Sequence, residues 1–265
     1  MQKNSIEVKN LKKVYPGGTK AVNGISFAVK EGEFFGFLGP NGAGKSTTIN
    51  ILANLVKKTS GSAKIDGLEV SEHTNEVYER IGFAMQEVGL DETATAHEML
   101  ELHGRLYHMP KATIEKQIVK LLKLVELENV ADRYASTYSG GMKRRFDLAL
   151  ALIHEPKVLF LDEPTTGLDP HARQLIWRHL RSLNKAGMTI LLTTHFMEEA
   201  EALCDRIAIV DRGKIVTLGT PAQLKKQHRA SNLEEVFLKV TGHTLGEEEG
   251  DPNAPDAYMR MWRRV

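Results

Sequence analysis

The sequence of 265 residues has one cysteine, Cys204, and nowhere a run of eighteen consecutive apolar residues. A single cysteine cannot form an internal disulfide, so the chain suits a reducing cytosol, and the apolar neighbours predict a small core residue at that position. The missing apolar run excludes an ordinary membrane-spanning helix, and the polar N-terminus lacks the apolar core of a secretory signal. We therefore expect a chain that neither spans a membrane nor is secreted by the usual route.

The chain also lacks an excess of charge of either sign. Its 35 basic residues stand against 34 acidic ones, which leaves a formal net charge of +1. No global field therefore favours binding to nucleic acid or to an anionic membrane. With 42% hydrophobic and 26% charged residues, the composition is that of a folded protein with one main domain, in which a subdomain can be inserted.

Apolar residues at every second position and short apolar runs predict strands, and we interpret the first three strands as an antiparallel layer. Those three strands are expected at 6–14, 25–29 and 33–38. From about 95 to 132 only helical periodicity is present, beginning with a capping box from Thr95 to Glu98, which predicts an inserted helical subdomain. Elsewhere strands and helices alternate, as in a parallel sheet covered by helices. These strands are expected at 63–65, 81–85, 158–161, 189–193, 207–210 and 214–218, and the helices at 45–55, 141–154, 170–186 and 196–203.

A glycine-rich segment between a strand pattern and a helix pattern matches the phosphate-loop motif G-x-x-x-x-G-K-[ST]. Its residues are Gly39, Pro40, Asn41, Gly42, Ala43, Gly44, Lys45, Ser46 and Thr47. Glycines let successive backbone N–H groups turn towards phosphate oxygens, and the helix N-terminus adds partial positive charge. In such a loop Lys45 supplies a full positive charge and the Ser46 hydroxyl ligates Mg²⁺. The segment therefore predicts nucleotide binding rather than an ordinary glycine-rich turn.

Two carboxylates, Asp162 and Glu163, follow the apolar strand at 158–161. Parallel sheets bind ligands at the carboxyl ends of their strands, so we expect both acids in the nucleotide site. Neighbouring strand residues point to opposite faces, which favours separate tasks: Asp162 holds Mg²⁺ through water, and Glu163 orients and deprotonates the attacking water. His195 follows the next apolar strand at the same expected edge, where an imidazole can reach the γ-phosphate.

A second glycine-rich segment lies just before a helical pattern and shortly before the acidic strand. Its residues are Tyr138, Ser139, Gly140, Gly141 and Met142. The serine and the N–H groups at this helix start form a second anion site. The segment resembles the signature motif of ATP-binding-cassette (ABC) proteins, usually written LSGGQ, with tyrosine and methionine in place of leucine and glutamine. Its position between the phosphate loop and the acidic strand is also that of the family.

Three basic residues, Lys143, Arg144 and Arg145, follow the signature segment in the first turns of its helix. Cations at this end oppose the helix dipole, so we expect negative groups near them. ATP held by a partner chain and acidic residues of the inserted subdomain both meet that requirement, and a solvated face is the remaining alternative.

The resemblance extends over about 6–242 and implies an α/β fold. That fold has a P-loop NTPase core with a RecA-like parallel sheet, an N-terminal antiparallel β layer and an α-helical subdomain inserted at about 90–155. The implied nucleotide-binding domain spans 1–245, and the implied activity is hydrolysis of ATP with Mg²⁺. The remaining residues, 246–265, include an acidic stretch rich in helix breakers, and we interpret them as a linker and a C-terminal tail that is disordered or docks.

Further site residues follow only from the resemblance. Tyr15 resembles the aromatic residue that stacks on adenine, and Val22 joins it among the nucleotide contacts. Gln86 resembles the glutamine that touches Mg²⁺ beside the docking groove of the membrane subunit, so it joins Glu163 and His195 as a catalytic residue. Asp169 resembles the residue of the loop that crosses the dimer interface, although Asp169-Pro170 is also what a helix N-cap and first turn require.

The resemblance also implies partners. In the family the signature of one subunit covers the γ-phosphate held by the other, so we expect a homodimer that sandwiches ATP, with a heterodimer as the alternative. The second expected partner is a separately encoded membrane permease, which would place the chain on the cytoplasmic face of the cell membrane, with no nucleic acid partner. ABC proteins that act on ribosomes or DNA usually carry two cassettes or a long coiled coil, and this sequence has neither.

The direction of transport rests on two segments, at 138–148 and 232–242, that are similar to the daunorubicin-resistance type of bacterial exporter ATPases. They favour export of a drug-like, lipid or other compound, while import remains the alternative because importer motors share every catalytic motif. In the second segment, apolar residues recur at helical spacing, which predicts a C-terminal helix packed on the body. These residues are Leu233, Val236, Phe237 and Val240.

Overall fold

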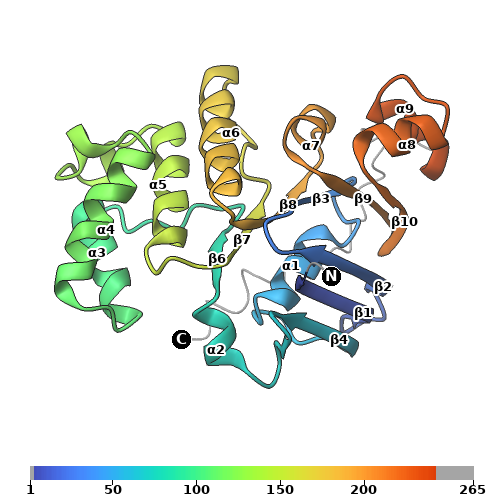
Figure 1. Cartoon of the computed structure of the whole chain (residues 1–265), viewed down its shortest axis with the longest axis horizontal. Helices are drawn as coiled ribbons and strands as arrows, with labels where there is room; N and C mark the ends of the chain where they lie inside the picture. Colours follow the sequence, from blue (N-terminus) through green and yellow to red (C-terminus); the bar gives the residue numbers. More distant parts are fainter. Residues whose placement is uncertain (1–2, 243–265) are drawn as a thin grey trace.

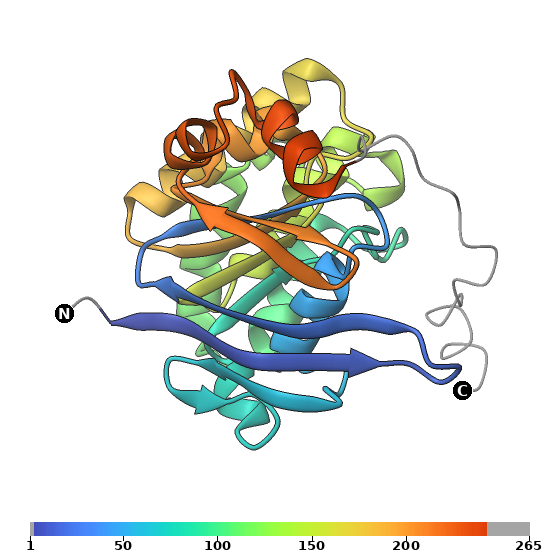
Figure 2. The same cartoon turned by 90° about the vertical axis from the view of Figure 1, so that its right-hand side faces the viewer.

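The computed structural model describes residues 3–242 and contains two sheets, with a group of helices standing to one side (Figure 1). The first sheet is antiparallel, in the order β2-β1-β4-β5. Its strands are β1 (Asn4–Val14), β2 (Lys20–Lys30), β4 (Ser60–Ile65) and β5 (Leu68–Glu69). Figure 2 shows this layer beside the second sheet, and the two are separate layers of the fold.

The second sheet has the order β10-β9-β3-β8-β7-β6, in which every pair is parallel except the edge pair of β10 and β9. Its strands are β3 (Phe34–Leu38), β6 (Ile81–Ala84), β7 (Val158–Asp162), β8 (Thr189–Thr194), β9 (Arg206–Asp211) and β10 (Lys214–Gly219). Every residue of β3, β7 and β8 is buried, as expected for parallel strands covered on both faces. The predicted α/β fold with an antiparallel layer is therefore confirmed.

Two strands lie in different sheets from those that we expected. The strand at 33–38, predicted as part of the antiparallel layer, is β3 at the centre of the parallel sheet. The strand at 63–65 is part of β4, which pairs with β1 in the antiparallel layer. The continuous apolar run Phe34–Leu38 fits burial on both faces, whereas adjacency in sequence alone does not determine which strands pair.

Helix α1 (Lys45–Leu52) contributes to a core cluster that also contains side chains from both sheets. The other face of the parallel sheet packs against a second cluster, which includes side chains from the remaining long helices. The helices of this cluster outside the inserted subdomain are α6 (Pro170–Lys185), α7 (Met197–Leu203), α8 (Pro221–Gln227) and α9 (Leu233–Thr241). The short helix α2 (Thr74–Tyr78) places Val77 in the first cluster instead. Leu233, Val236 and Phe237 of α9 are buried, so the C-terminal helix is confirmed. Cys204 is buried, as predicted.

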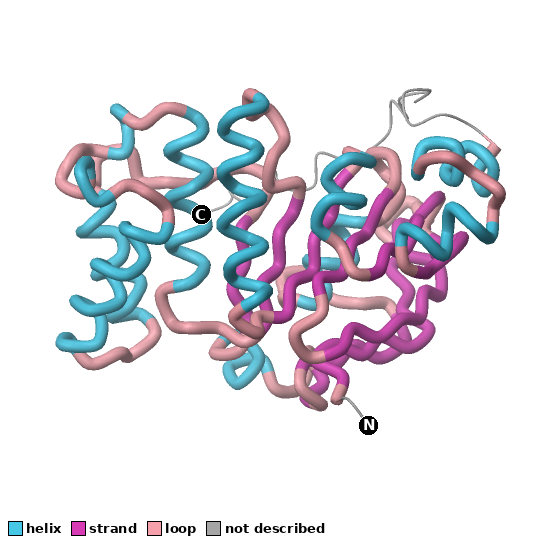
Figure 3. Tube along the Cα trace, turned by 45° about the horizontal axis from the view of Figure 1, so that its top comes forward, coloured by secondary structure: helices cyan, strands magenta, loops and turns pink. Residues whose placement is uncertain are grey.

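The inserted helical subdomain stands at one end of the molecule, as Figure 3 shows. It contains α3 (Ala96–Leu106), α4 (Lys111–Leu124), two short 3₁₀ turns (Glu128–Val130 and Ala135–Thr137) and α5 (Gly140–Leu152). The predicted capping box is present, because the Thr95 side chain accepts from the Glu98 N–H and the Glu98 carboxylate accepts from the Thr95 N–H. The predicted linker and tail at 246–265 lie outside the described residues. Within residues 3–242, the helices are too short or too polar to span a membrane.

Candidate functional site

Four strands of the parallel sheet end at one edge. The register pairs Leu38 of β3 with Thr194 of β8, and Asp162 of β7 with Thr193 of β8. Next along the sheet, Ala84 of β6 pairs with Leu161 of β7. The phosphate-loop segment, the two acids, His195 and Gln86 all follow these strand ends, so they gather at one edge as predicted for parallel strands.

The phosphate-loop segment needs glycine at particular positions. Gly44 has φ 100°, and a Cβ there would lie 2.2 Å from the Ala21 carbonyl oxygen. A Cβ on Gly39 would lie 2.2 Å from the Val210 carbonyl oxygen. The loop therefore follows a path that only a backbone without a side chain can take at these two points, close to β2 and β9. Its tip, at Asn41 and Gly42, is exposed.

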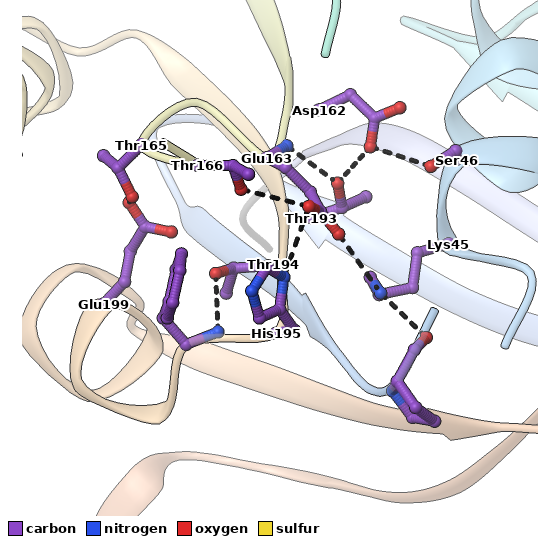
Figure 4. Close-up of polar contacts among 12 residues, drawn as sticks. Lys45, Ser46, Asp162, Glu163, Thr165, Thr166, Thr193, Thr194, His195 and Glu199 are labelled. Atoms are coloured by element: carbon purple, nitrogen blue, oxygen red, sulfur yellow. Dashed lines mark hydrogen bonds and ion pairs between the residues drawn. The ribbon is translucent and has the colours of Figure 1, made fainter. Parts of the chain in front are cut away.

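Lys45 begins α1 and is almost fully buried, with 4% of its side chain exposed. Its ammonium donates hydrogen bonds to the carbonyl oxygens of Gly39 (2.7 Å) and Pro40 (2.9 Å). It also lies 3.5 Å from Oε1 of Glu163 (Figure 4). A full positive charge is thus held inside the curve of the loop, beside a carboxylate that follows β7, two strands along the sheet from β3.

The Asp162 carboxylate contacts Ser46, the residue after Lys45, and Thr193 of β8. The Ser46 hydroxyl donates to Oδ1 of Asp162 at 3.0 Å, and the Thr193 hydroxyl contacts the same oxygen. Burial raises the pKa of the Asp162 carboxyl, while the hydrogen bonds from Thr193 and Ser46 act against the shift. The nearby Glu163 charge raises that pKa further, because two carboxylates in one site repel each other.

Glu163 directly follows β7 and adopts φ 49°, in the left-handed region that a side chain disfavours. Its backbone N–H donates to the hydroxyl and the carbonyl oxygen of Thr193, at 3.2 and 3.1 Å. Its Oε2 accepts from the Thr166 hydroxyl at 3.1 Å and lies 3.2 Å from Nδ1 of His195 (Figure 4). The carboxylate is therefore surrounded by a lysine, a threonine and a histidine.

The oxygen donors at this edge, from Ser46 and Asp162, fit Mg²⁺, which needs few protein ligands, better than they fit a metal ion that protein side chains must hold alone. Within residues 3–242, no three His, Cys, Asp or Glu side chains gather as a metal site. The oxygens of Ser46 and Asp162, 3.0 Å apart, are donors of the kind that Mg²⁺ uses. This ion takes few protein ligands and completes its shell with water and substrate phosphates.

The other residues expected to contact the nucleotide lie further from this cluster. Gln86 is exposed two positions beyond β6, one strand away from Asp162. Tyr15 is half-buried in the turn between β1 and β2, with the Lys13 ammonium 4.8 Å from its ring centroid. Val22 lies in β2 and is 1% exposed, so its side chain belongs to the core beside the loop.

The signature residues Ser139 and Gly140 are exposed at the start of α5. The Ser139 hydroxyl accepts from the Met142 N–H at 3.3 Å, which makes Ser139 the N-cap of the helix. Asp169 is likewise an exposed N-cap, because its carboxylate accepts from the N–H groups of His171 and Ala172. The hydrogen bond from Ala172, then that from His171, lowers the pKa of this carboxyl.

The structure brings further residues to the site that the sequence reasoning did not select. Thr193 contacts Asp162 through its hydroxyl and holds the backbone of Glu163. The parallel pairing of β7 and β8, which sets Thr193 opposite Asp162, was the signal that would have found it. Thr166, three residues after Glu163, donates to the same carboxylate.

Comparison with known proteins shows the family. The family model described as ABC transporter matches residues 22–166 of this chain. That segment contains the phosphate loop, the signature segment and both acids, in the order found here. The chain therefore belongs to the ABC transporter family, as an ATP-binding subunit of this class.

The relatives carry names of export and resistance proteins. The Nod factor export ATP-binding protein I of Rhizobium sp. (strain N33) is 44% identical over 277 residues, covering 98% of this chain and 91% of the relative. The daunorubicin resistance ATP-binding protein of Streptomyces coeruleorubidus is 39% identical over 263 residues, covering 97% of this chain and 81% of the relative. The predicted resemblance to the daunorubicin-resistance type is confirmed.

A solved ATP-binding cassette supports the same assignment. It is a dimer in a post-hydrolysis state bound to ADP and Pi, with a TM-score of 0.74 and 31% sequence identity. The match covers 81% of this chain and 98% of that chain. The fold is therefore that of ABC ATPases.

Proposed function

We propose that this chain is the ATP-hydrolysing subunit of an ABC exporter. The proposal rests above all on the convergence of Lys45, Ser46, Asp162, Glu163 and His195 at the carboxyl edge of the parallel sheet. A buried cation, two buried carboxylates and a histidine nitrogen 3.2 Å from one of them are parts of the kind that phosphoryl transfer to water uses. In this proposal, 1–245 forms the nucleotide-binding domain and 246–265 a linker and tail.

The phosphate loop binds the triphosphate of ATP. The backbone N–H groups of 39–47 and the N-terminus of α1 face phosphate oxygens, and the Lys45 ammonium supplies a full charge. Ser46 and Asp162 would hold Mg²⁺, with Gln86 as a further contact. When bound, the ion would neutralise negative charge on the phosphates. Tyr15 and Val22 contact the nucleoside end.

Glu163 is the general base. Its carboxylate accepts a proton from the water whose oxygen attacks the γ-phosphorus, as the bond to the ADP oxygen breaks. His195, whose Nδ1 lies 3.2 Å from Oε2 of Glu163, orients this carboxylate and reaches towards the γ-phosphate. The Thr166 hydroxyl at 3.1 Å restricts the same group. General-base help of this kind typically contributes about 10²–10⁴-fold in rate.

The catalytic unit is a homodimer, with a heterodimer as the alternative. Ser139, Gly140 and Gly141 lie at a helix start that faces solvent, where N–H groups can meet the γ-phosphate held by a second copy. Asp169 begins α6 at another exposed point and contacts that copy. The dimeric cassette with ADP and Pi, at 31% identity, supports this arrangement.

The second partner is a membrane permease encoded separately, and the dimer binds it on the cytoplasmic face of the membrane. Closing of the dimer on ATP and reopening after hydrolysis drive the permease. The names of the relatives, a Nod factor export protein and a daunorubicin resistance protein, support export over import. A drug-like compound, a lipid or another compound is the proposed cargo.

The test uses tagged Glu163→Gln protein, which keeps the shape of the side chain but cannot accept the proton. We expect it to form an ATP-bound dimer and to co-purify from source membranes with a multi-helix permease identified by mass spectrometry. Glu155→Gln, a change of the same chemistry at a surface ion pair, should hydrolyse ATP at the parent rate. Ribosomal or DNA-repair partners without a membrane protein would contradict the transport function, and turnover at the parent rate by Glu163→Gln would contradict the base.

A further inference from the structure

Arg144 is the middle residue of the basic run in α5, and it is buried rather than solvated, with 6% exposed. Its guanidinium donates to three backbone carbonyls. Nε donates to the Pro164 oxygen at 2.7 Å, Nη2 to the Asp162 oxygen at 3.0 Å, and Nη1 to the Met85 oxygen. One side chain of the helical subdomain therefore bonds directly to the edge of the parallel sheet.

Two of those carbonyls belong to the residues on either side of Glu163. The backbone of Glu163 has φ 49°, and such a conformation persists only where the surroundings hold it. The Arg144 guanidinium donates to the carbonyl oxygens before and after Glu163, while the Thr193 hydroxyl accepts from the Glu163 N–H. A planar guanidinium suits this task because its donors lie in a rigid fork.

Asp147, one turn along the same helix, holds the guanidinium itself. Its Oδ2 lies 3.2 Å from Nη1 of Arg144, and both side chains are largely buried. Burial lowers the pKa of Arg144, and the Asp147 carboxylate counteracts that shift. Nη1 is therefore held by both the Asp147 carboxylate and the Met85 carbonyl, while Nε and Nη2 bond the carbonyls on either side of Glu163.

The two neighbouring basic residues have different partners. Arg145 donates to the carbonyl oxygens of Val125 (2.6 Å) and Glu126 (3.2 Å), and Lys143 pairs with Glu92 at 2.6 Å. These partners lie within the inserted subdomain, which confirms one of the two expected sources of negative groups. Of the three basic residues, Arg144 is the one whose contacts include the sheet edge.

We propose that Arg144 is a positioning residue for Glu163, so that the base has its working geometry only while α5 is docked against the sheet. The proposal rests on the proposed function, in which Glu163 activates water. Ser139, the proposed contact with the second copy, is the N-cap of α5, the helix that carries Arg144. Met85, whose carbonyl accepts from Arg144, directly precedes Gln86, the residue expected beside the permease. Arg144 therefore connects both proposed contact points to the base. A shift of α5 relative to β7 breaks the two bonds that bracket Glu163.

The test compares Arg144→Lys with Arg145→Lys, the same substitution one residue along. Lysine keeps the charge but loses the fork, so Arg144→Lys should lower kcat by about 10- to 100-fold, since a misplacement of about 1 Å can cost about 10²-fold. Its affinity for ATP, measured with a fluorescent analogue, should change less than about threefold. Arg145→Lys should keep both values within about threefold of the parent.

A second comparison separates positioning from general damage to the fold. Arg144→Lys is combined with Glu163→Gln, and single-turnover hydrolysis is measured for the parent, both single variants and the double variant. If Arg144 acts through Glu163, the double variant should be no slower than Glu163→Gln alone. An equal fall in rate in both backgrounds, or loss of nucleotide affinity, would overturn the proposal.

Asp147→Asn provides a variant that leaves the arginine in place. It should lower kcat less than Arg144→Lys does, and the two changes together should not be additive, because they act on one fork. Should Glu163→Gln itself hydrolyse ATP at the parent rate, the proposed function fails. Should Glu163→Gln arrest turnover while Arg144→Lys leaves kcat unchanged, the role of Arg144 alone is wrong.

Discussion

The two glycine-rich anion sites of this chain differ in how the fold supports them. At the phosphate loop, Lys45 and Glu163 are buried and bonded to each other, and a Cβ on Gly44 would meet the backbone at 2.2 Å. At the signature segment, Ser139 and Gly140 are exposed, and a Cβ on Gly140 would meet nothing within 4 Å. The first site is packed within the chain, while the second faces outwards.

This difference indicates where a second chain is needed. The tip of the phosphate loop, at Asn41 and Gly42, is open to solvent, so groups of another chain can approach it. The outward N–H groups of α5 offer a second side that the same chain does not bring to its own loop. The contrast therefore supports the proposed dimer.

The largest expected difference is between two glycine-to-alanine changes. Gly44→Ala places a methyl group against the Ala21 carbonyl at φ 100°, so it should destabilise the fold by roughly 4 kcal/mol or more. Gly140→Ala has open space and a helical position, so it should change stability by less than about 1 kcal/mol. Urea unfolding of both variants measures the difference. Equal losses would contradict the contrast between a packed and an outward site.

Lys45→Ala should have the next largest effect, because it removes the buried charge of the packed site and leaves Glu163 without that partner. We expect ATP affinity to fall by about 100-fold, which corresponds to about 2.7 kcal/mol. Isothermal titration calorimetry of parent and variant with ATP and Mg²⁺ tests this. Affinity within threefold of the parent would mean that the backbone of the loop alone binds the phosphates.

Ser139→Ala should have a smaller effect, on turnover only. Ser139 and Thr95 are both N-caps of helices in the inserted subdomain, so either alanine variant should lose about 1 kcal/mol of stability. Ser139→Ala should also lower ATP hydrolysis, by about tenfold, because Ser139 belongs to the signature segment. Thr95→Ala should leave hydrolysis unchanged, because Thr95 lies outside that segment. Hydrolysis rates at saturating ATP and thermal melts separate the two effects. A matching fall in hydrolysis for Thr95→Ala would assign the loss to the helices rather than to the signature.

The last effect is a slope rather than a single loss, a dependence of stability on pH from Asp147. Burial raises the pKa of the Asp147 carboxyl to about 7, and the Arg144 charge acts against this shift. The pKa of an aspartate in the unfolded chain is about 3.9. Between these values the folded chain keeps a proton that the unfolded chain has lost. The free energy of unfolding therefore falls as pH rises from about 4 to 7, by at most about 1.4 kcal/mol per pH unit.

Asp147→Asn should remove this slope, so the parent should lose stability relative to the variant as pH rises across that window, and only there. Urea unfolding at several pH values between 4.5 and 8 measures it. A parent that gains stability relative to the variant as pH rises would show that attraction to Arg144 outweighs burial.

Much of the candidate site was predictable because its residues lie in short motifs. The spacing from Gly39 to Thr47, and the pair of acids after an apolar run, depend on neighbours in sequence, and each has a direct chemical reason. Thr193 and the bonds of Arg144 were not predictable in this way. Their roles depend on which strand pairs with β7 and on how α5 docks, and these are contacts between segments far apart in the chain.

The dependence on contacts between distant segments also explains why two strands were assigned to the wrong sheet. Periodicity identified the strands at 33–38 and 63–65, but it did not say which neighbours they pair with, because pairing is decided by burial in the assembled layers.

By itself, the sequence determined the class of protein, the phosphate loop, the acids and the capped helices, because each depends on local spacing and local chemistry. Only the tertiary structure decided that the Arg144 guanidinium lies beside Glu163 rather than in solvent. The physical reason is that a buried guanidinium must have its hydrogen-bond donors satisfied. The carbonyls that satisfy them lie at and beyond the ends of β7 and β6, and only the docking of α5 against the sheet brings them to Arg144.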